Sequence, residues 1–216
     1  MTVGEQEGID RHRTIQNCLQ AIAQKALGKT ETHVEREPWI IRGKTDIYGK
    51  VIEGLRGDIG LYDFHPQKPK TIIDVRVFHP TSKSLQEEFV KHEREKFKKY
   101  NQECNNENIE FVPFVVTTDG ALAPKAKSLL QRLTQTLATK WEVPEGVIRG
   151  WMKARIAMAI ARASSACIRR NRKTPLGFDK ELEVDFEDQA GVSRLLGLGQ
   201  MGWVENMNES QTSQET

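Results

Sequence analysis

Two aspartates in or beside short apolar strands constrain this sequence more than any other feature. Asp58 precedes the run Ile59–Leu61, Asp74 lies inside the run Thr71–Phe78, and fifteen residues separate the two acids. Both runs are typical of strands, and a Pro-containing loop joins them, so they are predicted to pair as an antiparallel hairpin. A carboxylate inside an apolar strand is costly to bury unless it is paired or binds a metal ion. The hairpin would bring the two acids near each other.

Two interpretations of this acidic pair are open from the residues alone. Adjacent carboxylates repel each other, and a bound Mg²⁺ removes that repulsion. Alternatively, each aspartate forms a salt bridge with one of the chain's 32 Lys and Arg side chains, because structural ion pairs produce the same pattern.

The remaining apolar pattern predicts a mixed α/β protein with a small central sheet flanked by helices. Helices are expected from Asp10 to about Leu27, from Ser82 or Ser84 to about Cys104, from Pro124 to about Lys140 and from Glu145 to about Arg170. Further strands are expected at 31–37 and 109–117, and residues 39–54 form either one more strand or a small insertion. Pro113 indicates an edge position or a bulge, and the strand that contains it is expected to join the sheet in parallel through a right-handed crossover.

The charge distribution divides the chain into regions. Residues 1–9 are predicted to be disordered, residues 10–173 to form one domain, and residues 174–216 to be an acidic, mostly disordered tail. Residues 140–173 hold nine Lys or Arg and two acids, whereas residues 179–216 hold nine acids and two basic residues. A basic body with an acidic tail favours a polyanionic partner. The alternative is a solvated helix face followed by a solubilising tail.

Other features exclude whole classes of protein. The three cysteines are far apart and include no CxxC pair, which argues against a zinc finger or a disulfide framework and favours a reducing, intracellular location. No apolar run is long enough to span a membrane, and the polar, acidic N-terminus is not a signal peptide. The basic run at 169–173 is a weak nuclear address. The four tryptophans show no spacing that indicates base binding.

Several short motifs occur in an order that is more specific than any one of them. They are Arg11-His12-Arg13, Glu37-Pro38, Arg56-Gly57-Asp58-Ile59, Asp74-Val75-Arg76-Val77-Phe78-His79-Pro80, Lys96-Phe97-Lys98-Lys99-Tyr100, Phe111-Val112-Pro113-Phe114 and Asp119-Gly120-Ala121-Leu122. With the predicted element order they resemble the PD-(D/E)XK nuclease fold. Within that fold they resemble the restriction-like endonuclease domain at the C-terminal end of reverse-transcriptase polyproteins of non-LTR retrotransposons. The resemblance covers roughly residues 10 to 172.

The resemblance implies a restriction-endonuclease-like domain with extra C-terminal helices, acting as a metal-dependent DNA endonuclease. It implies catalytic roles for Asp58, Asp74, Lys96 and Lys99, with Asp58, Asp74 and the carbonyl of Val75 holding Mg²⁺ or Mn²⁺. Contacts with nucleic acid are expected from His12, Arg76, Lys98, Arg169, Arg170, Arg172 and Lys173. His12 is equally well interpreted as a structural histidine.

Three departures from the family pattern carry information. Arg13 stands where the family often has Asn, and Gly57 stands where it usually has Pro. The catalytic lysine of the broader fold lies two residues after the second acid, where this chain has Arg76, and an arginine does not act as a proton acceptor. The narrower group supplies its lysine from the following helix, which makes Lys96 or Lys99 the candidate.

Two alternatives to an active nuclease remain. The first is a nucleic-acid-binding module that has lost catalysis, with phosphate contacts from the basic helix at 145–170 and binding that weakens steeply with salt. The second is an interaction protein in which both acids are ion-paired. In that case the apolar side of the helix with Trp151 would form a homodimer face rather than part of the core.

Overall fold

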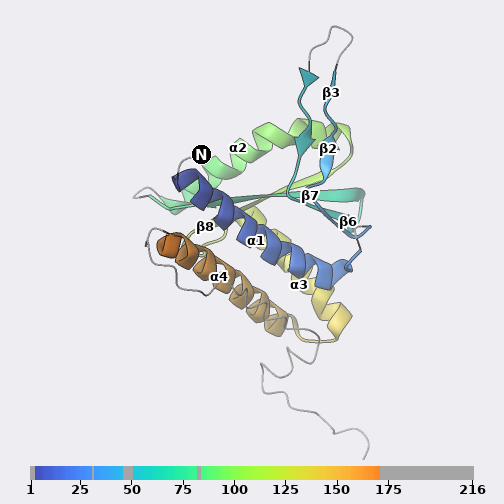
Figure 1. The fold of residues 1–216 in the computed structure, drawn as a ribbon. Helices are drawn as coiled ribbons and strands as arrows, with labels where there is room; N and C mark the ends of the chain where they lie inside the picture. Colours follow the sequence, from blue (N-terminus) through green and yellow to red (C-terminus); the bar gives the residue numbers. More distant parts are fainter. Residues whose placement is uncertain (1–2, 31, 46–50, 82–83, 171–216) are drawn as a thin grey trace, which may run out of the picture. The chain divides into compact units, whose positions relative to one another are not determined.

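The computed structural model describes residues 3–30, 32–45, 51–81 and 84–170, and Figure 1 shows their arrangement. This part of the chain contains four helices and eight strands, within a compact unit that spans residues 1–173. The helices are α1 (Val3–Leu27), α2 (Leu85–Asn106), α3 (Pro124–Trp141) and α4 (Glu145–Arg170). The strands are β1 (Val34–Arg36), β2 (Trp39–Ile41), β3 (Lys44–Thr45), β4 (Val51–Ile52), β5 (Leu55–Arg56), β6 (Ile59–His65), β7 (Lys68–Phe78) and β8 (Glu110–Thr117).

The central sheet has four strands in the order β1-β6-β7-β8. β6 and β7 pair antiparallel, with Ile59 opposite Ile73, which confirms the predicted hairpin. β8 joins β7 in parallel after the crossover through α2, as the alternation of helix and strand predicted. Pro113 lies on β8, an edge strand of this sheet, so the missing amide donor costs no ladder hydrogen bond on the open side.

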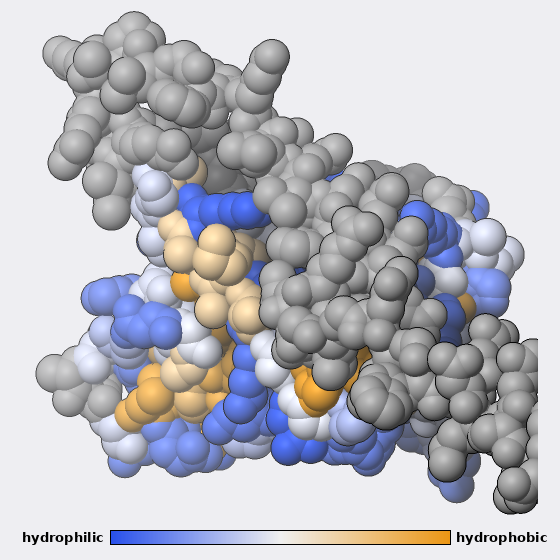
Figure 2. Space-filling model, turned by 90° about the horizontal axis from the view of Figure 1, so that it is seen from below, coloured by the Kyte–Doolittle hydropathy of each residue, from blue (hydrophilic) through white to orange (hydrophobic). Residues whose placement is uncertain are grey.

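Helices cover both faces of the sheet (Figure 1). α2 lies over one face, while α1 and α3 lie under the other, and α4 packs beneath α1 and α3. Trp151 of α4 is 7% exposed, and its ring lies 5.5 Å from that of Trp141. The residue is therefore part of the core of this chain. Seen from below, the molecule shows a patchwork of hydrophobic and hydrophilic side chains (Figure 2). Met158 of α4 is exposed.

The mixed α/β class and the small mixed sheet are as predicted, whereas the start of α1 is not. α1 begins at Val3, seven residues before the predicted start at Asp10. The predicted tail at 174–216 lies outside the described residues.

Residues 39–45 and 51–56 form a small insertion, one of the two arrangements left open by the sequence. β2 pairs with β5, and β3 pairs with β4, each antiparallel and each separate from the central sheet. Ile40 and Leu55 pack with Tyr100 and Cys104 of α2, which fixes the base of the insertion against the main fold. No helix among the described residues is long and apolar enough to cross a membrane.

Candidate active site

Asp58 lies where β6 begins, and it takes the place of a ladder partner for β7. Its amide donates to the carbonyl of Ile73 at 2.9 Å, and its Oδ2 accepts the amide of Val75 at 2.6 Å. The carboxylate thus binds the part of β7 that extends past the first residue of β6, next to Asp74. The prediction that the hairpin brings the two acids together is met at this point of the sheet.

Asp74 lies in the middle of β7, and 4% of its surface is exposed. Its side chain points to the face that α2 covers, where its Oδ2 forms a salt bridge with Lys96. In the part of the chain that the structure describes, this buried oxygen has the ammonium beside it but no hydrogen bond of good geometry. The carboxylate is therefore held by the charge of Lys96 at this oxygen, and Tyr100 of α2 also hydrogen-bonds to it.

Each helix brings two side chains, one turn apart, to one aspartate. On α1, His12 places Nε2 3.0 Å from Asp58 Oδ2, and Gln16 donates Nε2 to the carbonyl of Asp58 at 3.0 Å. On α2, Lys96 and Tyr100 stand in the same relation to Asp74. Residues at i and i+4 share a helix face, so each pair is aligned by the helix itself.

The two aspartates act on the titration of their helical partners. The hydrogen bond with Asp58 raises the pKa of His12 above its usual value, against the opposing effect of burial, and the charge of Asp74 adds to the increase. Burial raises the pKa of the Tyr100 phenol, and its hydrogen bond to Asp74 raises it further. Tyr100 therefore remains a neutral hydrogen-bond donor to Asp74, and the protonated form of His12 is favoured next to Asp58.

The donor set at this point suits a hard divalent cation. Mg²⁺ is commonly held by one or two carboxylates, with water and substrate phosphate completing its octahedron. Asp58 and Asp74 supply two carboxylates at one end of the β6–β7 pairing. Among the described residues no group of three or more His, Cys, Asp or Glu side chains is placed to hold a metal ion. The two aspartates would therefore bind Mg²⁺ together with oxygen ligands from the main chain, water or substrate.

The structure separates the two candidate lysines. Lys96 contacts Asp74, whereas Lys99 is exposed, with its Nζ 4.7 Å from the centroid of the Tyr100 ring. Arg76, on the same face of β7 as Asp74, lies 3.6 Å from Glu95. Arg76 stands two residues after Asp74, where the broader fold has its lysine. Its ion-pair partner is Glu95, which is neither of the two aspartates.

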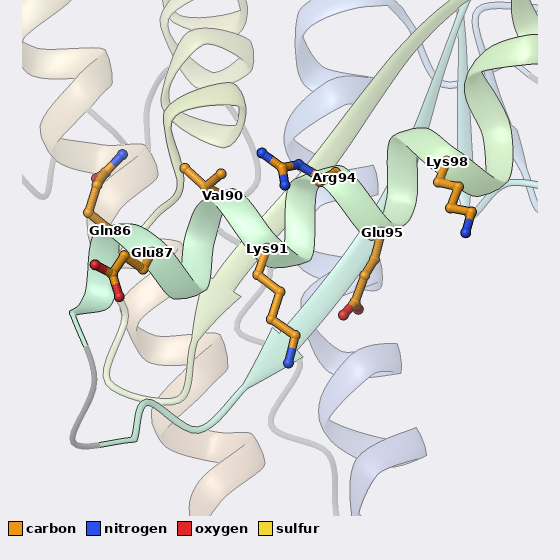
Figure 3. A pocket seen from close by; sticks show the side chains of 7 residues that line it. All are labelled: Gln86, Glu87, Val90, Lys91, Arg94, Glu95 and Lys98. Atoms are coloured by element: carbon orange, nitrogen blue, oxygen red, sulfur yellow. The ribbon is translucent and has the colours of Figure 1, made fainter.

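The other predicted nucleic-acid contacts lie away from the two aspartates or outside the described residues. Lys98 lies on the exposed side of α2, where it lines a surface hollow with Val90, Lys91 and Arg94 (Figure 3). The side chains of Arg169 and Arg170, at the end of α4, and the residues Arg172 and Lys173 lie outside the described part of the structure.

Sequence reasoning missed two residues of the site. Gln16 is buried, with 4% of its surface exposed, and a signal for it was present because it lies one turn after His12. Tyr100 is the last residue of the Lys96–Tyr100 motif, but no function was predicted for it. Its spacing of four residues from Lys96 indicates the same helix face.

The sequence matches no model of a protein family and no curated protein.

Proposed function

We propose that this chain is a metal-dependent endonuclease that hydrolyses phosphodiester bonds in DNA. The observation that carries the proposal is the meeting of Asp58 and Asp74 at the end of the β6–β7 pairing, with Lys96 against Asp74. Phosphodiester hydrolysis needs an activated water and positive charge beside the phosphate. A pair of carboxylates able to hold Mg²⁺ or Mn²⁺ and an adjacent lysine are suited to provide both.

The topology supports a restriction-endonuclease-like assignment. The first acid precedes one strand of a hairpin, the second lies within the other strand, and a parallel strand follows a crossover helix. This is the element order that the motifs resemble in the endonuclease domains of retroelement polyproteins. A lysine supplied by the following helix is also the arrangement implied for that narrower group, and Lys96 is the residue that meets Asp74.

Each side chain has a separate task in the proposed mechanism. Asp58, Asp74 and the carbonyl of Val75 would hold the Mg²⁺ or Mn²⁺, which supplies Lewis acidity and lowers the pKa of a bound water. Lys96 would place its ammonium beside the attacked phosphate, where it opposes the growing negative charge. His12 would hold Asp58 in orientation through the 3.0 Å contact.

The decisive experiment is cleavage of supercoiled plasmid and branched DNA with Mg²⁺ or Mn²⁺ and with EDTA. We expect metal-dependent nicking by the wild-type chain, loss of nicking in Asp58→Asn, and wild-type nicking in Asp119→Asn. Asp119 is the matched control because it is an exposed aspartate in the turn after β8. Thermal unfolding verifies that each variant is folded. Nicking that survives in Asp58→Asn contradicts the proposal.

A nucleic-acid-binding module without catalysis is the second candidate, and Arg76 favours it. The arginine stands at the position of the broader fold's lysine, and it pairs with Glu95. Under this alternative the chain binds DNA without metal, with affinity that falls as salt rises, and cleaves no substrate. Electrophoretic mobility shifts with EDTA at two salt concentrations, compared with the cleavage assay, separate the two candidates.

A further inference from the structure

An exposed tryptophan lies in the β2–β5 pair, whose second strand leads to Asp58. Trp39 of β2 lies opposite Arg56 of β5, and the guanidinium carbon of Arg56 is 4.8 Å from the centroid of the Trp39 ring. Gly57 donates its amide to the carbonyl of Pro38 at 3.0 Å. Asp58 is the next residue in the chain. The strand pair that carries Trp39 therefore leads directly to the first acid.

The position of the tryptophan ring is built into the local backbone. A Cβ atom at Gly54 would lie 2.4 Å from a ring carbon of Trp39, so only glycine permits this packing. Glu37 has φ 48°, a left-handed conformation that is unusual for this residue type. In this conformation its carbonyl and carboxylate both accept hydrogen bonds from Arg56, and its amide donates to the carbonyl of Asp58 at 2.9 Å.

Gly54 and Arg56 cover only part of the ring. Trp39 exposes 41% of its surface, and it is the only aromatic among the large exposed hydrophobic side chains of the described residues. The side chain of Arg56 is 43% exposed. An exposed aromatic with a guanidinium beside it is the combination on which proteins stack unpaired bases, while Arg also attracts the adjoining phosphates.

We propose that Trp39 and Arg56 form a stacking site for an unpaired nucleobase of a DNA strand whose neighbouring phosphate lies at Asp58 and Asp74. The inference rests on the proposed function, and it specifies the substrate class. The preferred substrate is DNA with an unpaired nucleotide beside the cleaved bond, such as a flap, a fork or a single strand. In a continuous duplex the base is already stacked between its neighbours and is not available to the tryptophan.

The test compares two labelled DNAs of equal length, a blunt duplex and a duplex with a single-stranded flap, in EDTA so that no cleavage occurs. We expect Trp39→Leu to weaken binding of the flap DNA roughly 5- to 150-fold, the range for loss of one stacked base, and to leave blunt-duplex binding unchanged. Trp39→Phe should restore part of the affinity, because a smaller aromatic still stacks. Met158→Ala is the matched control, since Met158 is exposed but lies on α4.

A fluorescence measurement keeps the test valid if a variant binds weakly for other reasons. Single-stranded DNA should quench part of the intrinsic tryptophan emission of the wild-type chain, and Trp39→Phe should remove that quenching. Salt-dependent DNA binding without preference for the flap and without quenching that depends on Trp39 would overturn the stacking site and leave the proposed endonuclease intact. Absence of binding to either DNA, in a folded protein, would overturn both.

Discussion

Two acidic side chains of neighbouring strands, Glu110 of β8 and Asp74 of β7, differ in their surroundings. Glu110 lies opposite Thr71, and both of its oxygens have partners: Arg132 donates at 2.7 Å and Thr71 at 2.6 Å. Asp74 lies three residues further along β7, is more deeply buried, and is held by Lys96 and Tyr100 of α2 next to a second carboxylate, Asp58. A single carboxylate in an ion pair stabilises a fold, whereas two carboxylates side by side are suited to hold a divalent cation.

The largest effect should come from exchanging the two acids for their amides. We expect Asp74→Asn to lower metal-dependent cleavage about a thousandfold, because it removes a negative charge that holds the cation. Glu110→Gln should keep near wild-type cleavage and lower the free energy of unfolding instead. Single-turnover cleavage rates and urea unfolding, measured on both variants, test the contrast. Equal loss of cleavage in the two variants would break the comparison.

The two lysines of α2 provide the next test. Lys96→Met should reduce the cleavage rate about a hundredfold, the loss typical for one charge-stabilising group. Lys99→Met should leave the rate close to wild type, because Lys99 is exposed and contacts only the ring of its neighbour among the interactions described here. The reverse order would place the catalytic lysine at Lys99, the other candidate from the sequence, and would show that α2 moves when DNA binds.

For Glu110, the comparison predicts that replacing its partner Arg132 lowers the stability of the fold. This side chain, 27% exposed, donates to Glu110 and to the carbonyl of Phe64, and its guanidinium lies 4.3 Å from the Phe64 ring. Arg132→Met should lower the free energy of unfolding by about 2 kcal/mol, because a half-buried carboxylate is left without its cation.

The control for this variant is another arginine ion pair. Arg149 pairs with Glu145 across one turn of α4 at 3.4 Å, with both side chains nearly half exposed. Such exposed pairs contribute little, so Arg149→Met should change the free energy of unfolding by about 0.5 kcal/mol or less. Equal losses in the two variants would mean that burial does not set the strength of the Glu110 pair.

The features of the site that depend on residues close together in the sequence could be predicted. β-Branched runs and the Pro-containing loop predicted the β6–β7 hairpin, and the hairpin alone placed Asp58 near Asp74. The i,i+4 spacing also contained Gln16 and Tyr100, although no pattern in the sequence says which face of a helix meets an acid. Helix faces are chosen by packing between distant elements, which the sequence pattern does not order.

Features that depend on contacts between distant residues escaped prediction. The stacking position of Trp39 depends on Gly54 and on the left-handed backbone at Glu37, and neither is visible in the spacing of tryptophans. The early start of α1 escaped because two glycines, Gly4 and Gly8, make residues 3–9 a poor helix by propensity.

An effect smaller than that of Arg132→Met is expected from the pH dependence of the Glu110 cluster. Burial alone would raise the pKa of Glu110, but the hydrogen bonds from Arg132 and Thr71 outweigh it, and the pKa lies below its ordinary value of 4.5. A lowered folded-state pKa contributes stability that is present above 4.5 and is lost as the pH falls through the folded value. We therefore expect the free energy of unfolding of the wild type to exceed that of Glu110→Gln by about 1 kcal/mol near pH 7. The difference should vanish in acid.

A double variant isolates the origin of this pH dependence. If the ion pair with Arg132 causes it, Glu110→Gln should have a much smaller pH-dependent effect in an Arg132→Met background, where the cation is already absent. Urea unfolding of the four proteins from neutral pH to below 4 measures the coupling directly. A difference that persists unchanged in the Arg132→Met background would assign the lowered pKa to the other groups beside the Glu110 carboxylate, the Thr71 hydroxyl and the His65 imidazole.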